Sequence, residues 1–171
     1  MKKATLALII RMTGGILEIL LGLKRGGPEI GEGMYNGPGG KLNEGETLPD
    51  CLAREVEEEV GIRLDASKAV KVAIITFHRE EKDFEVHIYR VDVSEGEPRE
   101  TDSMIPRWFP VDKIPWDRMH ASDRAWMPGL LAGKKFNAHV YYRIELYHKD
   151  GKEIKKERFD RIEIFLFEDH E

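Results

Sequence analysis

Apolar residues fall into short runs along this chain, and glycine, proline or charged residues separate the runs. Residues 6–10 and 17–23 are two such runs on either side of the sequence RMTGG, whose paired glycines suit a tight turn. This pattern predicts a β-hairpin. Residues 70–77 and 84–93 are two further strand candidates, which the charged sequence HREEKD joins.

The second half of the chain continues in the same way. Residues 92–104 read as a loop, and residues 106–111 (PRWFPV) as a short strand or bulge bounded by prolines. Residues 122–131 predict a short helix. Residues 136–148 and 153–167 predict a C-terminal hairpin around the turn sequence KDG, because Asp-Gly is a strong hairpin signal.

One segment has clear helical periodicity. Residues 47–60 can begin at Thr47 as N-cap and end before Gly61, which suits the left-handed position after a helix. The apolar positions recur every four residues at Leu48, Leu52, Val56 and Val60. This stripe predicts a helix that packs against a sheet. The preceding residues 25–45 are rich in glycine, with a spacing too ordered for a linker and too interrupted for a helix.

Strands outnumber helices, so we expect a mixed α and β fold with a mixed or largely antiparallel sheet. A length of 171 residues suits a single domain over residues 1–171. The apolar run at residues 4–10 is closed by Arg11 and lacks a cleavage site, so a buried strand explains it better than a signal peptide. No run reaches the ~18–20 apolar residues that a membrane span needs.

Charge and cysteine content narrow the function classes. The formal net charge is −5, which argues against a surface that coats a nucleic acid polymer. The single cysteine, Cys51, excludes an internal disulfide and favours a reducing compartment. We therefore expect a soluble, cytoplasmic protein that does not bind membranes or nucleic acid polymers.

The predicted helix carries an unusual group of acidic residues. Glu55, Glu58 and Glu59 stand at positions i, i+3 and i+4, so their carboxylates lie on one face beside the apolar stripe. Like charges at this spacing are destabilising, and Mg²⁺ or Mn²⁺ would remove that cost by binding the carboxylate oxygens. The alternative is a solvated acidic face, which helices often present.

The residues before the helix favour the metal site. Starting at Gly40, the sequence follows the pattern G-x5-E-x7-R-E-U-x-E-E-x-G-U, where U is aliphatic. The defined positions are Gly40, Glu46, Arg54, Glu55, Val56, Glu58, Glu59, Gly61 and Ile62. This pattern resembles the motif of the Nudix family. The sequence agrees with the motif at every defined position, and chance is a poor explanation for such a match.

The resemblance extends over residues 4–145 and is closest to the MutT-type branch, especially to oxidised-purine nucleoside triphosphatases. The segments that carry it are LLGLKR, YNGPGGKLNEGET, VHIYRVD, PRWFPVDKIPW, SDRAWMPGLL and KKFNAHVYY. The resemblance implies a mixed sheet between helices, with the motif forming a loop–helix–loop. It also implies a small-molecule nucleotide substrate.

The resemblance assigns roles to the motif residues. Glu55, Glu58 and Glu59 would bind Mg²⁺, or Mn²⁺, together with the backbone carbonyl of Gly39. Arg54 and Glu46 would pair and brace the loop against the helix. Metal binding would polarise a phosphate and make a bound water available as nucleophile. A carboxylate of the cluster, close to other negative charge, should have a raised pKa. The expected products are a nucleoside monophosphate and pyrophosphate.

Lys24, Gly40 and Lys41 are the candidates for phosphate contacts, although the two lysines can equally be plain solvated residues. Asn36 matches a residue that hydrogen-bonds the purine in the relatives, and its alternative role is to form a turn before Gly37.

Further pocket residues come from aromatic and acidic positions. Phe77 and Trp126 match pocket walls but can equally belong to the core. His120 stands where the relatives have a stacking tryptophan, and Asp123 is the one aspartate kept from their Trp-Pro-Asp-Asp segment. The sequence here is HASD.

A second departure concerns a carboxylate near the metal. The relatives carry a glutamate where this chain has Ser103, so either Asp102 or Glu100 substitutes for it, or the site holds one metal fewer. The reaction class does not depend on this choice.

Three alternatives remain beside a triphosphate pyrophosphohydrolase. The changed pocket residues leave room for other diphosphate-linked substrates, such as dinucleoside polyphosphates or nucleotide sugars. A non-catalytic nucleotide sensor would usually lose motif glutamates, and this chain keeps them. An isopentenyl diphosphate isomerase is disfavoured by the YNGPGG segment. We expect a monomer.

Overall fold

The computed structural model describes residues 1–25, 33–92 and 96–167. Its strands form one mixed sheet in the order β3-β2-β1-β6-β5-β8-β9, with β4 paired to β1 and β7 paired to β2. The strands are β1 (Lys2–Thr13), β2 (Ile16–Lys24), β3 (Tyr35–Asn36), β4 (Gly39–Lys41), β5 (Val70–His78), β6 (Phe84–Asp92), β7 (Met104–Pro110), β8 (Phe136–Lys149) and β9 (Lys152–Leu166). The α-helices are α1 (Leu48–Val60) and α2 (Asp123–Leu131), and short 3₁₀ turns occur at Ala66–Lys68 and Trp116–Arg118.

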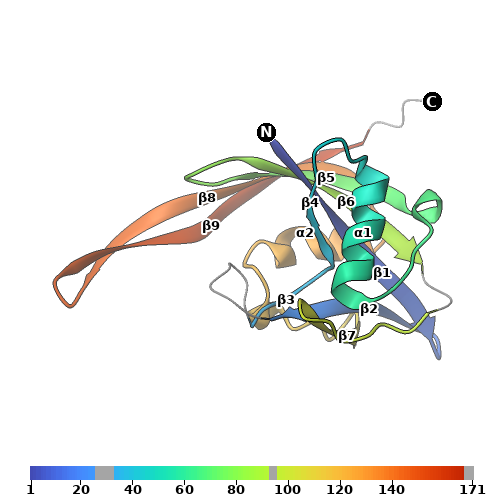
Figure 1. The fold of residues 1–171 in the computed structure, drawn as a ribbon. Coiled ribbons are helices and arrows are strands. Elements are labelled where there is room, and N and C mark those ends of the chain that lie inside the picture. The colour runs from blue at the N-terminus through green and yellow to red at the C-terminus, as the bar shows by residue number, and fades with distance from the viewer. Residues whose placement is uncertain (26–32, 93–95, 168–171) are drawn as a thin grey trace.

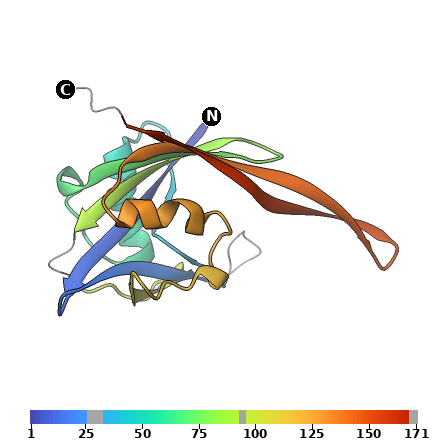
Figure 2. The same cartoon turned by 180° about the vertical axis from the view of Figure 1, so that it is seen from behind.

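The two helices lie on opposite faces of the sheet (Figures 1 and 2). Successive residues of β1 point to opposite faces. The core layer beneath α2 includes Leu6, Leu8, Ile10, Trp126, Met127 and Leu130. The core layer beneath α1 includes Ala7, Ile9, Leu52, Val56 and Val60. The predicted arrangement of a mixed sheet between helices is therefore confirmed.

The predicted hairpin of β1 and β2 is present, but only its end is paired as a hairpin. Thr13 pairs with Ile16 around two glycines with positive φ, and the β1–β2 register extends to Ile10 and Ile19. The rest of β1 pairs in parallel with β6 and antiparallel with β4. Strand β1 is consequently the centre of the sheet, which explains its long apolar run.

Helix α1 has the predicted caps. The Thr47 hydroxyl accepts a hydrogen bond from the Asp50 amide at 3.2 Å. Gly61 has a φ of 73° and its amide donates to the Glu57 carbonyl at 3.0 Å. Three residues of the stripe are fully buried, whereas Leu48 is only partly buried. Burying each such side chain stabilises the fold by roughly 1.5–3 kcal/mol.

Several predicted boundaries shift. Residue 93 of the predicted fourth strand, and residues 26–32 of the glycine-rich segment, lie outside the described residues. The described remainder of that segment contains the short strands β3 and β4. Met104 belongs to β7 rather than to the preceding loop, and β7 is a regular strand because it pairs with β2 over seven residues.

The C-terminal hairpin is confirmed: its first strand extends one residue further than predicted, and its second begins and ends one residue earlier. Strands β8 and β9 pair from Phe136 and Leu166 to Lys149 and Lys152. They form a long two-stranded arm that extends away from the rest of the molecule (Figures 1 and 2). In the described part of the chain, neither helix has the length and apolar character that crossing a membrane requires.

Candidate active site

The backbone of β4 lies directly against the acidic face of α1. The Gly39 amide donates to Glu59 Oε1 at 2.9 Å. A Cβ atom at Gly40 would lie 2.4 Å from the carboxylate carbon of Glu55, and one at Gly39 would lie 2.1 Å from the carbonyl oxygen of Thr5. Glycine is thus required at Gly39, where the neighbouring atoms are backbone, whereas a side chain at Gly40 would displace the Glu55 carboxylate.

The expected ion pair between Arg54 and Glu46 is present. Arg54 Nε donates to Glu46 Oε1 at 2.6 Å, and Nη2 donates to Glu46 Oε2 at 3.0 Å. Hydrogen bonds from Arg54 lower the pKa of Glu46 to about 2. This contact fastens the loop before α1 to the middle of the helix.

Arg54 also bridges two of the three motif glutamates. Its Nη1 donates to Glu55 at 2.8 Å and to Glu58 at 3.2 Å. The Glu58 side chain remains 56% exposed, whereas Glu59 is partly buried next to Glu55. Glu55 and Glu58 therefore share one Arg54 nitrogen, and Glu55 also neighbours Glu59. Within residues 1–25, 33–92 and 96–167, no three potential metal ligands surround a common point.

The pair of glutamates suits a divalent cation. Burial raises the pKa of Glu59 to about 7, and the charge of Glu55 contributes a smaller part. The sequence led us to expect such a raised pKa from neighbouring charge, but desolvation is the main cause. Two adjacent carboxylates that resist ionising together are hard oxygen donors that Mg²⁺ or Mn²⁺ would favour.

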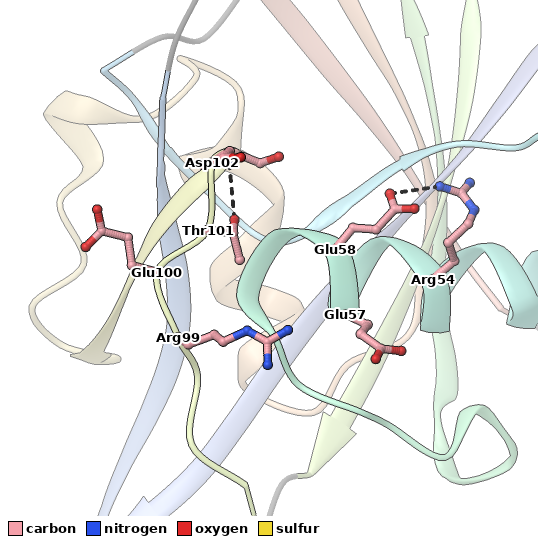
Figure 3. Close-up of a pocket in the computed structure, with 8 residues that line it drawn as sticks. Arg54, Glu57, Glu58, Arg99, Glu100, Thr101 and Asp102 are labelled. Carbon is pink, nitrogen blue, oxygen red and sulfur yellow. Dashed lines mark hydrogen bonds and ion pairs between the residues drawn. The ribbon is translucent and has the colours of Figure 1, made fainter.

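The loop before β7 packs on the C-terminal end of α1. The Arg99 amide donates to the Val60 carbonyl at 2.8 Å, and the Thr101 hydroxyl donates to the Glu59 carbonyl at 2.7 Å. The loop and the helix enclose an open pocket of about 900 Å³ (Figure 3). Its lining residues are Arg54, Glu57, Glu58, Arg99, Glu100, Thr101, Asp102 and Ser103.

The two candidates for the carboxylate that Ser103 lacks have different surroundings in this pocket. Glu100 forms an ion pair with Arg25, and its side chain points away from α1 (Figure 3). Asp102 forms no ion pair with any of the described residues.

Asn36 and Phe77 have local partners of their own. Asn36 Oδ1 accepts a hydrogen bond from the Gly37 amide at 2.9 Å, which is the turn role considered from the sequence. Its amide nitrogen can still donate to a ligand. Phe77 is partly buried and stacks on Phe84 with a centroid distance of 5.1 Å.

The N-terminal part of α2 carries unpaired polar atoms. Asp123 is 4% exposed and Trp126 is 1% exposed. Neither Asp123 Oδ2 nor Trp126 Nε1 has a hydrogen-bond partner among the described residues. Burial raises the pKa of Asp123 to about 7. Trp126 belongs to the core, as one reading of the sequence allowed, but such orphaned polar atoms are rare in folded proteins and point to a ligand.

Lys24 links the two regions. Its positive charge lowers the pKa of Glu59 on α1 and also the pKa of His120 before α2, where burial is the larger cause. Lys41, by contrast, has an exposed side chain, and its backbone carbonyl accepts from Arg54 at 3.2 Å. The charge of Lys24 therefore influences both a glutamate of α1 and the partly buried histidine before α2.

Three further residues near the start of α2 were not predicted from the sequence to belong to the site: Ser122, Tyr142 and Arg79. Ser122 Oγ hydrogen-bonds Tyr142 OH at 2.8 Å, and the charge of Arg79 lowers the pKa of His120. The only sequence signal was Ser122, which stands where the relatives have the first aspartate of their Trp-Pro-Asp-Asp segment. Nothing local indicates that Arg79 or Tyr142 approaches α2, because the contacts span distant parts of the sequence.

Comparisons with known proteins agree with this arrangement. The NUDIX domain family matches residues 1–130. An oxidized purine nucleoside triphosphate hydrolase from Danio rerio is 40% identical over 135 residues, which cover 79% of this chain and 83% of that protein. The protein of the same name from Mus musculus is 38% identical over 126 residues, which cover 74% of this chain and 80% of that protein.

Solved structures with the same fold include a MutT protein from Bacillus halodurans, with a TM-score of 0.67, 19% identity and coverage of 94% of this chain and 98% of that one. A MutT NUDIX hydrolase from Burkholderia pseudomallei has a TM-score of 0.58 and 28% identity, covering 72% of this chain and 94% of that one. The motif, the fold and the relatives lead to one conclusion: the chain belongs to the Nudix family and is a hydrolase of phosphoric anhydride bonds.

Proposed function

We propose that this enzyme hydrolyses nucleoside triphosphates that carry an oxidised purine, releasing a nucleoside monophosphate and pyrophosphate with the help of Mg²⁺ or Mn²⁺. The observation that carries the proposal is the position of Lys24 at the end of β2, which pairs there with β3, the strand of Asn36, and with Met104 of β7, next to Ser103. Its charge acts both on Glu59 and on His120. A nucleotide that spans these groups would have its phosphates at the glutamates and its base near α2.

At the phosphate end, Glu55 and Glu59 would hold the cation, with the Gly39 carbonyl beside them. Glu58 would join after its contact with Arg54 is exchanged for one with the metal. The bound cation would neutralise phosphate charge and supply an activated water. Arg54 would keep its ion pair with Glu46 and so hold the loop before α1 in place against the helix.

Cationic and backbone groups would orient the triphosphate. Lys24 stands between the two ends, Lys41 is exposed beside β4, and Gly40 lets the backbone approach the phosphates without a Cβ atom. We further propose that Asp102 supplies the carboxylate that the family usually places at residue 103.

At the base end, His120 would stack on the purine, with Phe77 and Trp126 in the surrounding wall. The unpaired Oδ2 of Asp123 and the amide nitrogen of Asn36 are the atoms that would read the base edge. A carboxyl group with a pKa of about 7 is partly protonated at neutral pH, so Asp123 can donate to a carbonyl oxygen as well as accept.

One observation favours a second candidate function. Asn36 Oδ1 is engaged by Gly37, and only one aspartate of the usual two is present, so the base is held by fewer polar groups. An enzyme with weaker base selection would suit diphosphate-linked substrates such as dinucleoside polyphosphates or nucleotide sugars.

A substrate panel distinguishes the two functions. The purified protein would be incubated with Mg²⁺ and 8-oxo-dGTP, dGTP, diadenosine tetraphosphate or a nucleotide sugar, and the products separated by anion-exchange chromatography. We expect the highest kcat/KM for the oxidised triphosphate, with pyrophosphate as product. Release of orthophosphate and a nucleoside diphosphate alone would refute the proposed bond cleavage, and a preference for a linked substrate would favour the second function.

A further inference from the structure

Arg79, in the turn after β5, forms an ion pair with Glu157 on β9, 78 residues further along the chain. Arg79 Nε donates to Glu157 Oε1 at 2.8 Å, and Nη2 donates to the same oxygen. The two side chains are only 29% and 23% exposed. Hydrogen bonds from Arg79 lower the pKa of Glu157. The guanidinium group is therefore held in one orientation rather than left in solvent.

Tyr142 on β8 supports the same guanidinium group from another side. The guanidinium carbon lies 5.4 Å from the centroid of the Tyr142 ring. The Tyr142 hydroxyl bonds to Ser122, which is fully buried and immediately precedes Asp123. Burial is the main cause of the raised pKa of Tyr142, and the negative charge of Asp123 adds a smaller part. The arm thus reaches the start of α2 through Tyr142.

Arg79 lies over the ring of Tyr142, whose hydroxyl bonds to Ser122 directly before α2. His120 lies two residues before Ser122. Burial lowers the pKa of His120, and the charges of Arg79 and Lys24 lower it further. Arg79 consequently stands at the end of the site where the proposed function places the base.

The Nη1 group of Arg79 has no hydrogen-bond partner among the described residues. The hydrogen bonds of Arg79 to protein within the described ranges use Nε and Nη2, which leaves both N–H groups of Nη1 available. Glu157 compensates the positive charge, so the pair offers directed donors to a neutral base without attracting anions. A carbonyl oxygen on the base would satisfy such a donor, whereas an amino group would face it donor to donor.

We propose that Arg79 is a specificity residue that donates through Nη1 to a carbonyl oxygen of the nucleobase, so that keto purines bind better than amino purines. The inference rests on the proposed function in that it needs a base beside His120. The competing explanation is that the ion pair only fastens the arm to the sheet.

Equilibrium binding of dGMP and dAMP tests the proposal without requiring hydrolysis. Isothermal titration calorimetry would compare the wild type with Arg79→Ala and Arg79→Lys. Lysine keeps a charge for Glu157 but lacks the planar fork that serves two partners at once. We expect both variants to raise the Kd for dGMP about tenfold, the loss typical of a charge-assisted hydrogen bond, and the Kd for dAMP less than about threefold.

The matched control is Arg158→Ala, which removes the exposed pair with Glu145 (3.0 Å) on the same arm and should leave both affinities unchanged. Equal losses for the two nucleotides would assign the pair a purely fastening role. Unchanged affinities, or a wild type that binds neither nucleotide, would also overturn the proposal. If Arg79→Ala melts at a lower temperature, Arg79→Lys decides.

A parallel assay of triphosphate hydrolysis by the wild type keeps the two proposals apart. Absence of hydrolysis would reject the proposed function while a keto preference in binding still stood. Hydrolysis with an unchanged keto preference in the Arg79 variants would reject only the role of Arg79.

Discussion

The amide of Gly39 donates to the carboxylate of Glu59 at 2.9 Å, although 20 residues separate them in the sequence. This hydrogen bond lowers the pKa of Glu59 while burial raises it, and burial has the larger effect. A backbone donor thus fixes one oxygen of the glutamate beside the carboxylate of Glu55. The same contact sets the distance between β4 and α1.

Glu58→Gln tests the acidic face. We expect turnover to fall at least ~10²-fold, because a charged metal ligand would be lost from a site in which metal carries the chemistry. The fold should survive, since Glu58 is exposed and its removal relieves repulsion on the helix. Steady-state kinetics with Mg²⁺ titration provide the measurement. Glu57→Gln, on the exposed side facing Arg63, is the control and should retain activity. Similar rates in both variants would contradict the metal role.

Asp102→Asn tests the replacement of the carboxylate absent at Ser103. We expect kcat to fall by roughly 10²-fold, within the range for losing a general base. Glu100→Gln is the matched control, because Glu100 is engaged by Arg25. Measuring kcat for both at saturating Mg²⁺ separates the candidates. A larger loss in Glu100→Gln would reverse the assignment.

His120→Ala tests stacking on the base. Removing the imidazole should raise KM roughly tenfold, since stacking on a base is worth about 1–3 kcal/mol. The value of kcat should change less, because the contact is common to ground and transition states. His120→Trp should lower KM for purine triphosphates. His148→Ala, which alters an exposed histidine near the tip of the arm, is the control. An unchanged KM in His120→Ala would exclude stacking.

Asp123→Asn tests the buried carboxyl group through pH. The folded-state pKa of about 7 lies above the unfolded value of about 4, so the folded protein binds this proton more tightly. The wild type should therefore lose stability as pH rises from about 4 to about 7, and the Asn variant should lack this loss. Urea unfolding of both proteins across this range measures the difference. A constant difference in unfolding free energy would show that Asp123 does not titrate as described.

The same variant bears on recognition. Asparagine cannot change its protonation, so Asp123→Asn should alter the ratio of activities between purines more than the overall rate. Equal losses on all nucleotides would place Asp123 away from the base.

Local signals explain what the sequence predicted well. The caps at Thr47 and Gly61, the Asp150–Gly151 turn and the motif of residues 40–62 each depend on neighbours a few positions apart. Helical periodicity also placed three glutamates on one face. It could not reveal that one Arg54 nitrogen bonds both Glu55 and Glu58, because this depends on side-chain contacts rather than on spacing.

Contacts between distant segments explain what the sequence missed. The Arg79–Glu157 pair and the Ser122–Tyr142 hydrogen bond require the turn after β5, the start of α2 and the arm to meet. The sequence of the charged turn does not indicate that it contacts the arm, and the strand pattern of the arm does not indicate that it contacts the turn. Trp126 shows a related ambiguity, since a tryptophan can serve the core and still leave Nε1 for a ligand.

The parallel pairing of β1 with β6 has a consequence for the order of folding. Lys2 pairs with Phe84 and Ile10 with Asp92, so the central strand of the sheet lacks this neighbour until residue 92 has been synthesised. The next parallel pairing, of β5 with β8, waits for Phe136 and the residues after it. Such high contact order slows folding. A nascent chain on the ribosome would thus complete its sheet only after β9, which ends at Leu166, has been synthesised.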